Sequence, residues 1–464
     1  MKIQGNIGNG KNNGKYLAIL LLFYCSTVIY LSNATANVPM MDYWKYITML
    51  VDKAFTKGIS FNDLWNYNGN GNIHRVPFQL WTFLLNASVF HLNTQIAIYA
   101  APVVTAVTMV LIYRRTRRVF EENIWYWAGI TLVTAFCFSW NAFEILTLEF
   151  SFAFAVRKTL FIVSFFAVNS FLTETEKNKQ HAIEIAILFL FTITCFSGAY
   201  FAAYGLALSI VIIWDFFRKN REERKKYFSS YIILGLGMLA GLFLYVYQMD
   251  STSTASLGIT FSFGMIIDFA KALTMAAGGM LAGAESPTNL ITIAGIIFLA
   301  AQAVLLIVFF YQKQYRQSYI PIIISLYVFF LVAELLMGRG NIFSVRYLAS
   351  SRYLFDFNLI VIADVWIILQ SLRQEGKQKP ILKKCLSCAL MIYLGLGALL
   401  VYSSEWKTAP YRKLYYDNLA ETLIHADEAT DEQLLYYQDD VESVRKGIEI
   451  MKKYDLGVFR YTEK

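Results

Sequence analysis

The 464-residue chain is poor in charged residues, in proline and in cysteine. Charged residues make up 16% of it, whereas soluble domains carry about 25%. Seven prolines and the lack of any low-complexity tract exclude collagen-like and linker-dominated chains. The few cysteines all lie in apolar stretches, which gives no sign of the disulfide framework of a small secreted protein; they are Cys25, Cys137, Cys195, Cys385 and Cys388.

Chemical signatures of common soluble enzymes are missing as well. No Walker loop follows a strand pattern, no G-x-S-x-G occurs, and no His/Cys cluster has metal-ligand spacing. Cys385 and Cys388 form a CxxC, but no second ligand pair accompanies them, which favours packing over metal binding. Nucleotide chemistry on the cytoplasmic side therefore has no visible support.

Apolar residues are what the chain has in excess. They make up 57% of it, aromatic residues 16%, and the mean hydropathy is +0.45. One or two globular cores cannot hide this surplus, because a soluble domain contains about 45–50% apolar residues. The composition predicts an all-α polytopic membrane protein.

Eleven segments are long and apolar enough to span a bilayer, which takes about 20 residues in a helix. We expect spans near residues 17–33, 93–113, 124–141, 155–172, 182–198, 199–217, 229–247, 288–311, 319–337, 354–372 and 385–402. The first of them also fits a cleavable signal peptide ending near Ala34-Thr35-Ala36, and this alternative stays open.

The net charge of +8 predicts the orientation of the chain. Before residue 403, alternate inter-span segments hold 22 Lys and Arg residues when the N-terminus is placed inside, and the remaining sequence holds 10. The positive-inside rule then places the N-terminus in the cytoplasm and, after eleven spans, the tail outside. Short basic runs between apolar segments are topology signals, and nucleic acid is not an expected partner.

Two larger non-membrane pieces are expected outside. We expect a transmembrane domain over 1–402, whose first outer loop, 34–92, carries interfacial helices, and an extracytoplasmic helical tail over 403–464. Within the loop, Trp44, Ile47, Leu50, Val51 and Phe55 recur on one helical face, which predicts a helix lying flat on the membrane. In the tail, the spacing of apolar residues predicts a helix over 440–454.

Residues at the outer surface are the candidates for chemistry. Asp42 follows the first span, where a carboxylate can take a proton from an acceptor hydroxyl, although Asp also serves as a helix N-cap. His74 and Arg75 suit phosphate oxygens, and they equally suit an anchor at the headgroups.

Two further groups of cations lie close to predicted span ends. Arg157 and Lys158 lie at the outer mouth of the fourth span, where they either serve function or form an internal ion pair. The loop before the tenth span carries three arginines against the topological rule, which indicates an anionic ligand, while Glu334 offers Arg339 an internal partner instead. The loop residues of interest are Arg339, Arg346, Arg352 and Tyr353.

Several short motifs together resemble the GT-C superfamily of membrane glycosyltransferases, and more narrowly a bacterial set of uncharacterised GT-C-like proteins. They are Asp42-Tyr43-Trp44, Leu64-Trp65-Asn66, His74-Arg75-Val76-Pro77-Phe78, Ser351-Arg352-Tyr353, Val444-Arg445-Lys446-Gly447-Ile448 and Leu456-Gly457-Val458-Phe459. The resemblance covers nearly the whole length of the chain.

This resemblance implies transfer of a sugar from a polyprenyl-phosphate carrier to an outward-facing glycan or lipid acceptor of the bacterial cell envelope. Asp42 would be the base, and His74, Arg75, Arg339, Arg346 and Arg352 would hold the lipid phosphate. Met41 and Ile73 stand where relatives often carry acids. No cofactor is therefore required, since arginines can hold the leaving phosphate, and a divalent cation stays an open alternative.

Two other functions remain as alternatives at this stage. A polysaccharide repeat-unit polymerase or ligase would also use outer arginines and a lipid-linked glycan. A non-enzymatic lipid or glycan transporter would place charges near the membrane midplane, often in broken helices. The Gly-rich stretch 278–283 is the feature that fits a broken helix.

Overall fold

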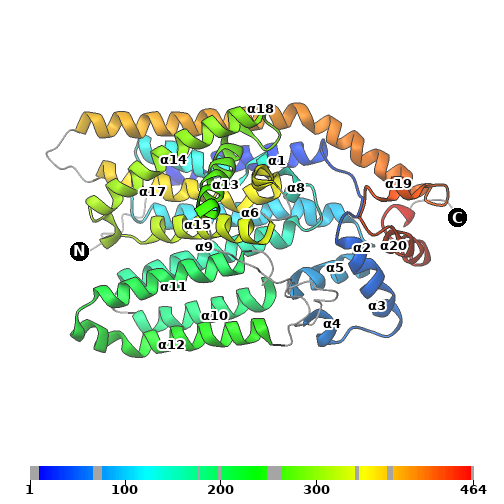
Figure 1. Ribbon diagram of the computed structural model, residues 1–464, viewed down its shortest axis with the longest axis horizontal. Coiled ribbons are helices and arrows are strands. Elements are labelled where there is room, and N and C mark those ends of the chain that lie inside the picture. The colour runs from blue at the N-terminus through cyan, green and yellow to red at the C-terminus, as the bar shows by residue number, and fades with distance from the viewer. Residues whose placement is uncertain are drawn as a thin grey trace.

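The computed structural model describes residues 10–65, 76–174, 177–196, 200–247, 263–339, 344–373 and 380–460. In these residues the regular structure is entirely helical (Figure 1). Twelve helices are long and apolar enough to cross a membrane. The predicted class, an all-α polytopic membrane protein with about eleven spans, is confirmed.

Each of the eleven predicted spans overlaps a long helix or two consecutive helices. They are α1 (Gly10–Ser32), α6 (Thr94–Thr116), α7 (Ile124–Cys137), α9 (Ser151–Thr173), α10 (Asn178–Phe196), α11 (Phe201–Arg218), α12 (Arg221–Val246), α14 (Thr288–Tyr311), α15 (Ile320–Arg339), α16 (Ser351–Phe357) with α17 (Ile360–Arg373), and α18 (Pro380–Ile424). Figure 1 shows most of these helices running along the long axis of the molecule.

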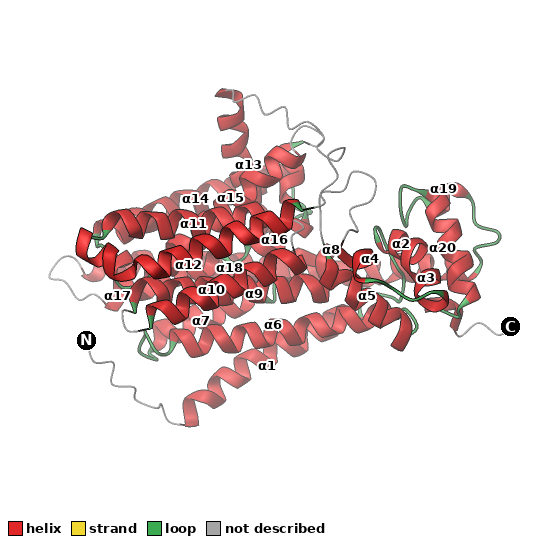
Figure 2. Cartoon of the chain, turned by 90° about the horizontal axis from the view of Figure 1, so that it is seen from below, coloured by secondary structure: helices red, strands yellow, loops and turns green. Residues whose placement is uncertain are grey.

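The twelfth candidate is α13 (Phe263–Ala282), which ends in the Gly-rich stretch. Figure 2 shows its start at an edge of the molecule, where Ile266 is 63% exposed, while its second half is buried. It packs so closely on α14 that a Cβ on Gly278 would lie 1.8 Å from the carbonyl oxygen of Ile291. Only glycine permits such a close approach of two helix backbones.

The basic segments gather at one end of the molecule, here named the basic end. The Arg117 guanidinium donates to Asn13 at the start of α1 (2.7 Å), and Arg373 donates to the Val119 carbonyl (2.7 Å). Arg218, at the end of α11, donates to the Tyr319 hydroxyl (2.7 Å). These contacts join segments that the charge pattern assigns to one side of the membrane.

The opposite end carries a compact helical cap (Figures 1 and 2). It combines two parts of the chain that lie far apart in sequence and share one apolar core. The first outer loop gives α2 (Tyr43–Tyr46), the π-helical turn η1 (Ile47–Val51), α3 (Asp52–Thr56), α4 (Phe61–Trp65) and α5 (Pro77–Val89), and the tail gives α19 (Asp431–Leu434), α20 (Val441–Lys453) and η6 (Gly457–Arg460).

The cap covers the apolar face that the sequence places on the membrane. Trp44, Ile47, Leu50 and Val51 are buried, and η1 contacts α20 directly. The helical prediction for 440–454 is confirmed by α20. The apolar face of the loop helix therefore packs on the tail of the same chain.

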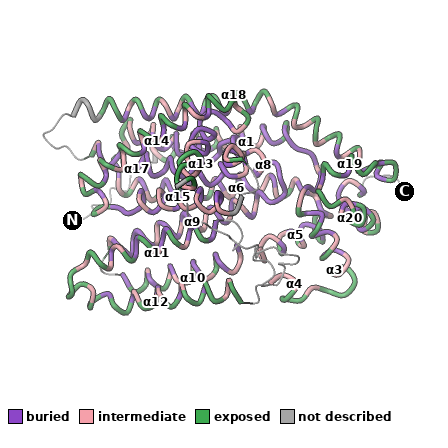
Figure 3. Tube along the Cα trace, viewed as in Figure 1, coloured by how far each residue is buried: buried purple, intermediate pink, exposed green. Residues whose placement is uncertain are grey.

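Burial differs strongly between the helices (Figure 3). Every residue from Ile360 to Ser371 of α17 is buried, whereas α12 and α14 expose long rows of apolar side chains such as Leu239 (63%) and Ile307 (67%). Such rows suit contact with lipid. The 45 residues of α18 run without a break through residues 402 and 403, so the expected start of the tail falls inside one helix.

Candidate functional site

Asp42 lies where the cap joins the long helices. It precedes α2, and its carboxylate, 52% exposed, makes no side-chain cap hydrogen bond; its nearest cation is Lys45, 3.6 Å away. The preceding Met41 has a φ of 53° in the left-handed region and donates its N–H to the Tyr437 carbonyl (2.8 Å). A turn fixed by the tail therefore presents Asp42 outward.

Glu149 lies beside this turn, in the short connection between α8 (Phe143–Leu146) and α9. Its Oε1 accepts the Met40 N–H (3.0 Å), and its Oε2 is buried without a partner. Burial first, and the negative charge of Asp42 in addition, raise the pKa of the Glu149 carboxyl to about 8. Two acids with different environments thus meet at the junction, a pattern suited to acid–base chemistry.

Arg352 is held by an acid at the same end of the molecule. Its guanidinium and its backbone N–H both donate to Glu144 (2.9 and 3.0 Å), and Ser351 donates to the same carboxylate (2.8 Å). This links α16 to α8. The Arg352 side chain remains 31% exposed, so its outer face stays open to an anion.

Arg157 and Lys158 are buried inside the helices. Arg157 pairs with Asp356, whose other oxygen accepts the Tyr327 hydroxyl proton (3.1 Å). Lys158 donates to the Phe355 carbonyl (3.0 Å). With exposed side-chain fractions of 5% for Arg157 and 1% for Asp356, this arrangement matches the internal ion pair that the sequence left open.

Arg346 lies in the 3₁₀ turn η5 (Val345–Ala349), and no carboxylate of the described residues pairs with it. It donates to the carbonyls of Ala284 (2.6 Å) and Ser286 (3.0 Å), just beyond the end of α13. Its positive charge is therefore not neutralised by an acid, unlike that of Arg352 or Arg157. It is the described arginine best placed to receive an anion.

Arg412 of α18 was not among the residues singled out from the sequence. Its guanidinium bridges Glu405 and Glu285 (both 3.1 Å) and stacks 3.3 Å from the ring centroid of Phe143. Glu405 also accepts the Tyr30 hydroxyl proton (3.1 Å). Arg412 lies after the predicted end of the last span, where a basic residue carries no distinctive signal.

These groups, some exposed and some buried, lie below the cap and are linked by pairwise contacts; together they are here named the junction surface. Tyr416 lies between the Glu149 group and the Arg412 group. Its hydroxyl lies 3.2 Å from that of Thr147, and its side chain is close enough to interact electrostatically with Glu149 and with Arg412. The surface contains Asp42, Glu144, Glu149, Glu285, Arg346, Arg352, Glu405 and Arg412.

Other candidates lie elsewhere or outside the described residues. His74 and Arg75 fall in a segment that is not described, and the Arg339 side chain is likewise not described. Tyr353 is buried and packs edge-on against Tyr347, with 5.7 Å between the ring centroids. Glu334 accepts the N–H groups of Tyr200 (3.1 Å) and Ala203 (2.9 Å) at the start of α11.

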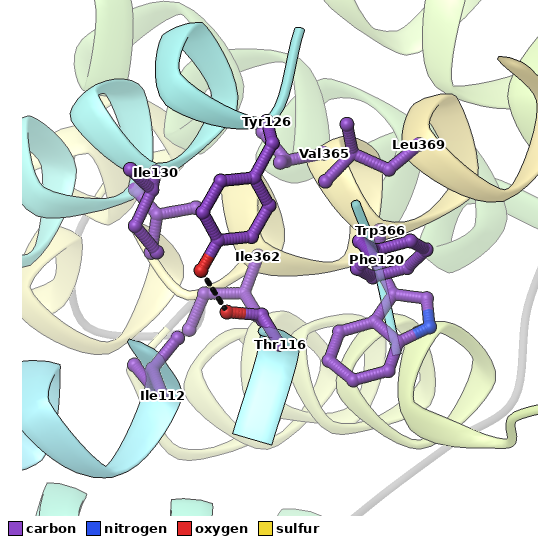
Figure 4. A pocket seen from close by; sticks show the side chains of 10 residues that line it. Ile112, Thr116, Phe120, Tyr126, Ile130, Ile362, Val365, Trp366 and Leu369 are labelled. Atoms are coloured by element: carbon purple, nitrogen blue, oxygen red, sulfur yellow. Dashed lines mark hydrogen bonds between the residues drawn. The ribbon is translucent and has the colours of Figure 1, made fainter. Parts of the chain in front are cut away.

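Enclosed space at the described residues is small. Figure 4 shows a cavity of about 10 Å³ among apolar side chains of α6, α7 and α17, beside a hydrogen bond between Tyr126 and Thr116 (3.1 Å). That volume holds about one water molecule. A shallow polar groove of about 400 Å³ runs along the outer part of α18 near His425 and Gln433.

A metal site is not evident in the described part of the chain. No group of three or more His, Cys, Asp or Glu side chains comes together there. Asp42 and Glu149 offer two carboxylates, and one Glu149 oxygen already accepts the Met40 N–H. This donor set does not fit the ligand number that hard divalent cations require.

The fold and the junction surface define a multi-pass helical membrane protein with a cap at one end. No protein-family model matches the sequence, and no curated protein matches it significantly.

Proposed function

We propose that the chain is a membrane glycosyltransferase that moves a sugar from a polyprenyl-phosphate carrier to an outward-facing glycan or lipid acceptor. The observation that carries this proposal is that an exposed acid, Asp42, lies near a buried acid, Glu149, at the junction surface. The wider GT-C assignment rests on the sequence motifs.

The proposed reaction needs one base and one anion site. The acceptor hydroxyl oxygen attacks the anomeric carbon of the sugar and the bond from that carbon to the phosphate oxygen breaks. The hydroxyl proton passes to Asp42, and polyprenyl phosphate leaves with the bond electrons. Because burial raises the pKa of Glu149 to about 8, its carboxyl group holds its proton at neutral pH, and Asp42 is the proposed acceptor of the hydroxyl proton.

Arg346 is the proposed partner of the lipid phosphate. No acid of the described residues pairs with its charge, and it lies with Arg352 in the segment that opens α16. Guanidinium groups suit phosphate oxygens because their N–H donors form a planar fork. His74, Arg75 and Arg339 remain candidates for the same role from the sequence alone.

The proposed setting is a bacterial inner membrane with the cap on the outer side. The basic segments gather at the basic end, which the positive-inside rule assigns to the cytoplasm. The acceptor and the lipid-linked donor would then meet at the junction surface, where the helices end and the cap begins.

A substitution of Asp42 tests the proposal. In membranes from cells that make the chain, Asp42→Asn should reduce sugar transfer from a polyprenyl-phosphate donor by a factor of 100 or more, on the order of general-base contributions. Asp52→Asn is the matched control, since Asp52 is an exposed acid of the same cap that pairs with Lys453 and Tyr454. Full activity of Asp42→Asn, at equal expression and melting temperature, would remove Asp42 from the mechanism.

A further inference from the structure

The most buried helix of the molecule carries an acid that the proposed transfer does not use. Asp364 lies in the middle of α17, with 0% of its surface exposed. Neither of its carboxyl oxygens has a hydrogen bond of good geometry, and the side chain close enough to interact with them is that of Gln302. A buried carboxylate without a donor or a counter-ion is among the costliest groups in a membrane protein.

The polar side chain that faces Asp364 is Gln302 of α14. The Gln302 amide nitrogen donates to the Ser325 hydroxyl (3.4 Å), and its amide oxygen is buried without a partner. Three oxygens on two packed helices therefore lack a donor. Turning the amide over would bring one N–H toward one carboxyl oxygen and would still leave the negative charge without a counter-ion.

Among the side chains that the structure describes, the elements packed against α17 supply no cation to this position; the side chain of Arg339, at the end of α15, is not described. α7 and α14 contain no charged residue, and α18 contains none between Cys385 and Ser404. On α15, Glu334 accepts N–H groups of α11. Arg373, the other charged residue of α17, donates to Val119 at the basic end.

The tyrosine hydroxyls of α15 and of residues 385–404 of α18 are already engaged with other acceptors. Tyr327 of α15 donates to Asp356 (3.1 Å), and Tyr393 of α18 donates to the Ala294 carbonyl (2.7 Å). Tyr402 of α18 donates to the Ala135 carbonyl (2.9 Å). None of these hydroxyl protons is directed at Asp364.

We propose that Asp364 is a proton-binding site in the membrane core, with Gln302 beside it as the acceptor side chain. A proton on the carboxyl group removes the charge and converts one of the three unpartnered oxygens into a donor. A divalent cation would not be satisfied here, because a hard cation such as Ca²⁺ takes about 6–8 oxygen ligands, and these side chains offer four oxygens, counting Ser325.

The site has a polar continuation toward the basic end. Gln370, six residues further along α17, is buried with both amide atoms unpartnered. Six residues of helix span about 9 Å. Gln370 lies between Asp364 and the basic end, about 120° away around the helix axis, and we expect the proton to exchange with solvent from that end.

Asp356 provides an internal comparison eight residues earlier. It is equally buried, but it pairs with Arg157 and accepts the Tyr327 hydroxyl proton. Two buried acids in adjoining helices thus have opposite surroundings. The expected difference is that Asp356 is compensated by the Arg157 cation, whereas Asp364 is compensated by a proton.

Infrared spectroscopy of the full chain in lipid nanodiscs tests this assignment. At neutral pH the wild type should show a C=O stretching band of a protonated carboxylic acid in addition to the band expected from Glu149, and this additional band should shift after transfer into D₂O. Asp364→Asn should remove this band, while Asp356→Asn should retain it. Equal melting temperatures of wild type and Asp364→Asn would show that the band change does not come from misfolding.

Three outcomes would overturn the proposal. The additional band is absent from the wild type, it persists in Asp364→Asn, or it fails to shift in D₂O because the proton does not exchange. As a separate measurement, melting temperatures in sodium and in choline buffer distinguish a proton from a monovalent cation. A stabilisation by sodium that Asp364→Asn abolishes would assign the site to the cation instead.

Discussion

At the scale of single residues, the main feature of this chain is that some buried charged residues are paired with each other, whereas Asp364 has no counter-ion. Arg157 and Asp356 are both almost fully buried and pair with each other. In such a pair, the desolvation penalty of each ion is offset by the other ion, so removing one partner leaves an uncompensated charge. Arg157 is therefore better explained as a structural residue than as a substrate ligand.

Arg157→Gln should consequently lower the stability of the protein by about 3–5 kcal/mol, because it leaves the Asp356 charge buried alone. The double variant Arg157→Gln/Asp356→Asn should recover most of this loss. Thermal unfolding of the purified variants in one detergent gives the comparison. A loss of sugar transfer with an unchanged melting temperature in Arg157→Gln would instead return Arg157 to the substrate site.

Glu149 predicts a pH dependence of stability whose sign follows from its surroundings. Its pKa rises from the ordinary 4.5 to about 8 because the folded chain buries it. The folded state then binds more protons than the unfolded state between these values, so stability falls as the pH rises from 4.5 to 8. Glu149→Gln should flatten this part of the profile of melting temperature against pH.

Glu421→Gln, which changes an exposed acid on α18, is the control for Glu149. It should leave the pH profile as in the wild type. If Glu149→Gln and Glu421→Gln gave the same profile, Glu149 would not be the buried acid responsible for the loss of stability at higher pH.

The sequence identifies some of the important residues and misses others, and the difference has a physical reason. Asp42 and Arg346 stand out because they are charged residues next to long apolar runs. Asp356 and Asp364 lie inside one predicted span, and a systematic search for acids within spans would have singled them out. Their partners were not accessible in this way, because Arg157 and Gln302 come from helices that only the fold brings next to α16 and α17.

At the scale of elements, the cap depends on a close contact between α20 and the loop helix. A Cβ on Gly447 would lie 2.7 Å from Cε3 of Trp44. The indole of Trp44 is fully buried, and its N–H donates to the Pro39 carbonyl (2.9 Å), so the ring has no room to shift. The close approach requires glycine at this position of α20.

Gly447→Ala should therefore destabilise the cap. Overpacking costs about 1–3 kcal/mol, and the better helix propensity of alanine offsets about 1 kcal/mol of it. Limited proteolysis should cut the tail faster in this variant than in the wild type. Gly14→Ala, where a Cβ meets nothing within 4 Å, is the matched control and should leave the rate unchanged.

The element scale also shows what an amphipathic pattern leaves undetermined. The spacing of Trp44, Ile47, Leu50 and Val51 correctly predicts a helix with one apolar face. The same pattern suits a lipid surface and a protein surface, because both remove apolar side chains from water. The tail that covers this face follows about 400 residues later in the chain, and no local pattern in the sequence connects the two.

At the scale of the whole molecule, the number of crossings determines on which sides the two ends lie. The eleven predicted spans correspond to helices that run between the basic end and the cap end (Figure 1). α13 was not predicted as a span, although it is as apolar as α10, which was predicted. α12 starts at the basic end, and the segment before α14 contacts Arg412 and Arg346 near the cap.

α12 runs toward the cap end, and α14 begins there. The stretch between them, which contains α13, therefore adds no net crossing. An odd number of crossings then puts the cap and the basic end on opposite sides.

Cysteine labelling in intact cells tests this. In a variant whose five native cysteines are replaced by serine, Lys446→Cys on α20 should react with an impermeant maleimide, whereas Lys225→Cys near the start of α12 should react after permeabilisation alone. Both lysines are exposed, so the two cysteine variants are matched. Equal labelling of the two in intact cells would contradict the odd count of crossings. Labelling of the Lys225 position alone would contradict the outward cap on which the proposed transfer reaction depends.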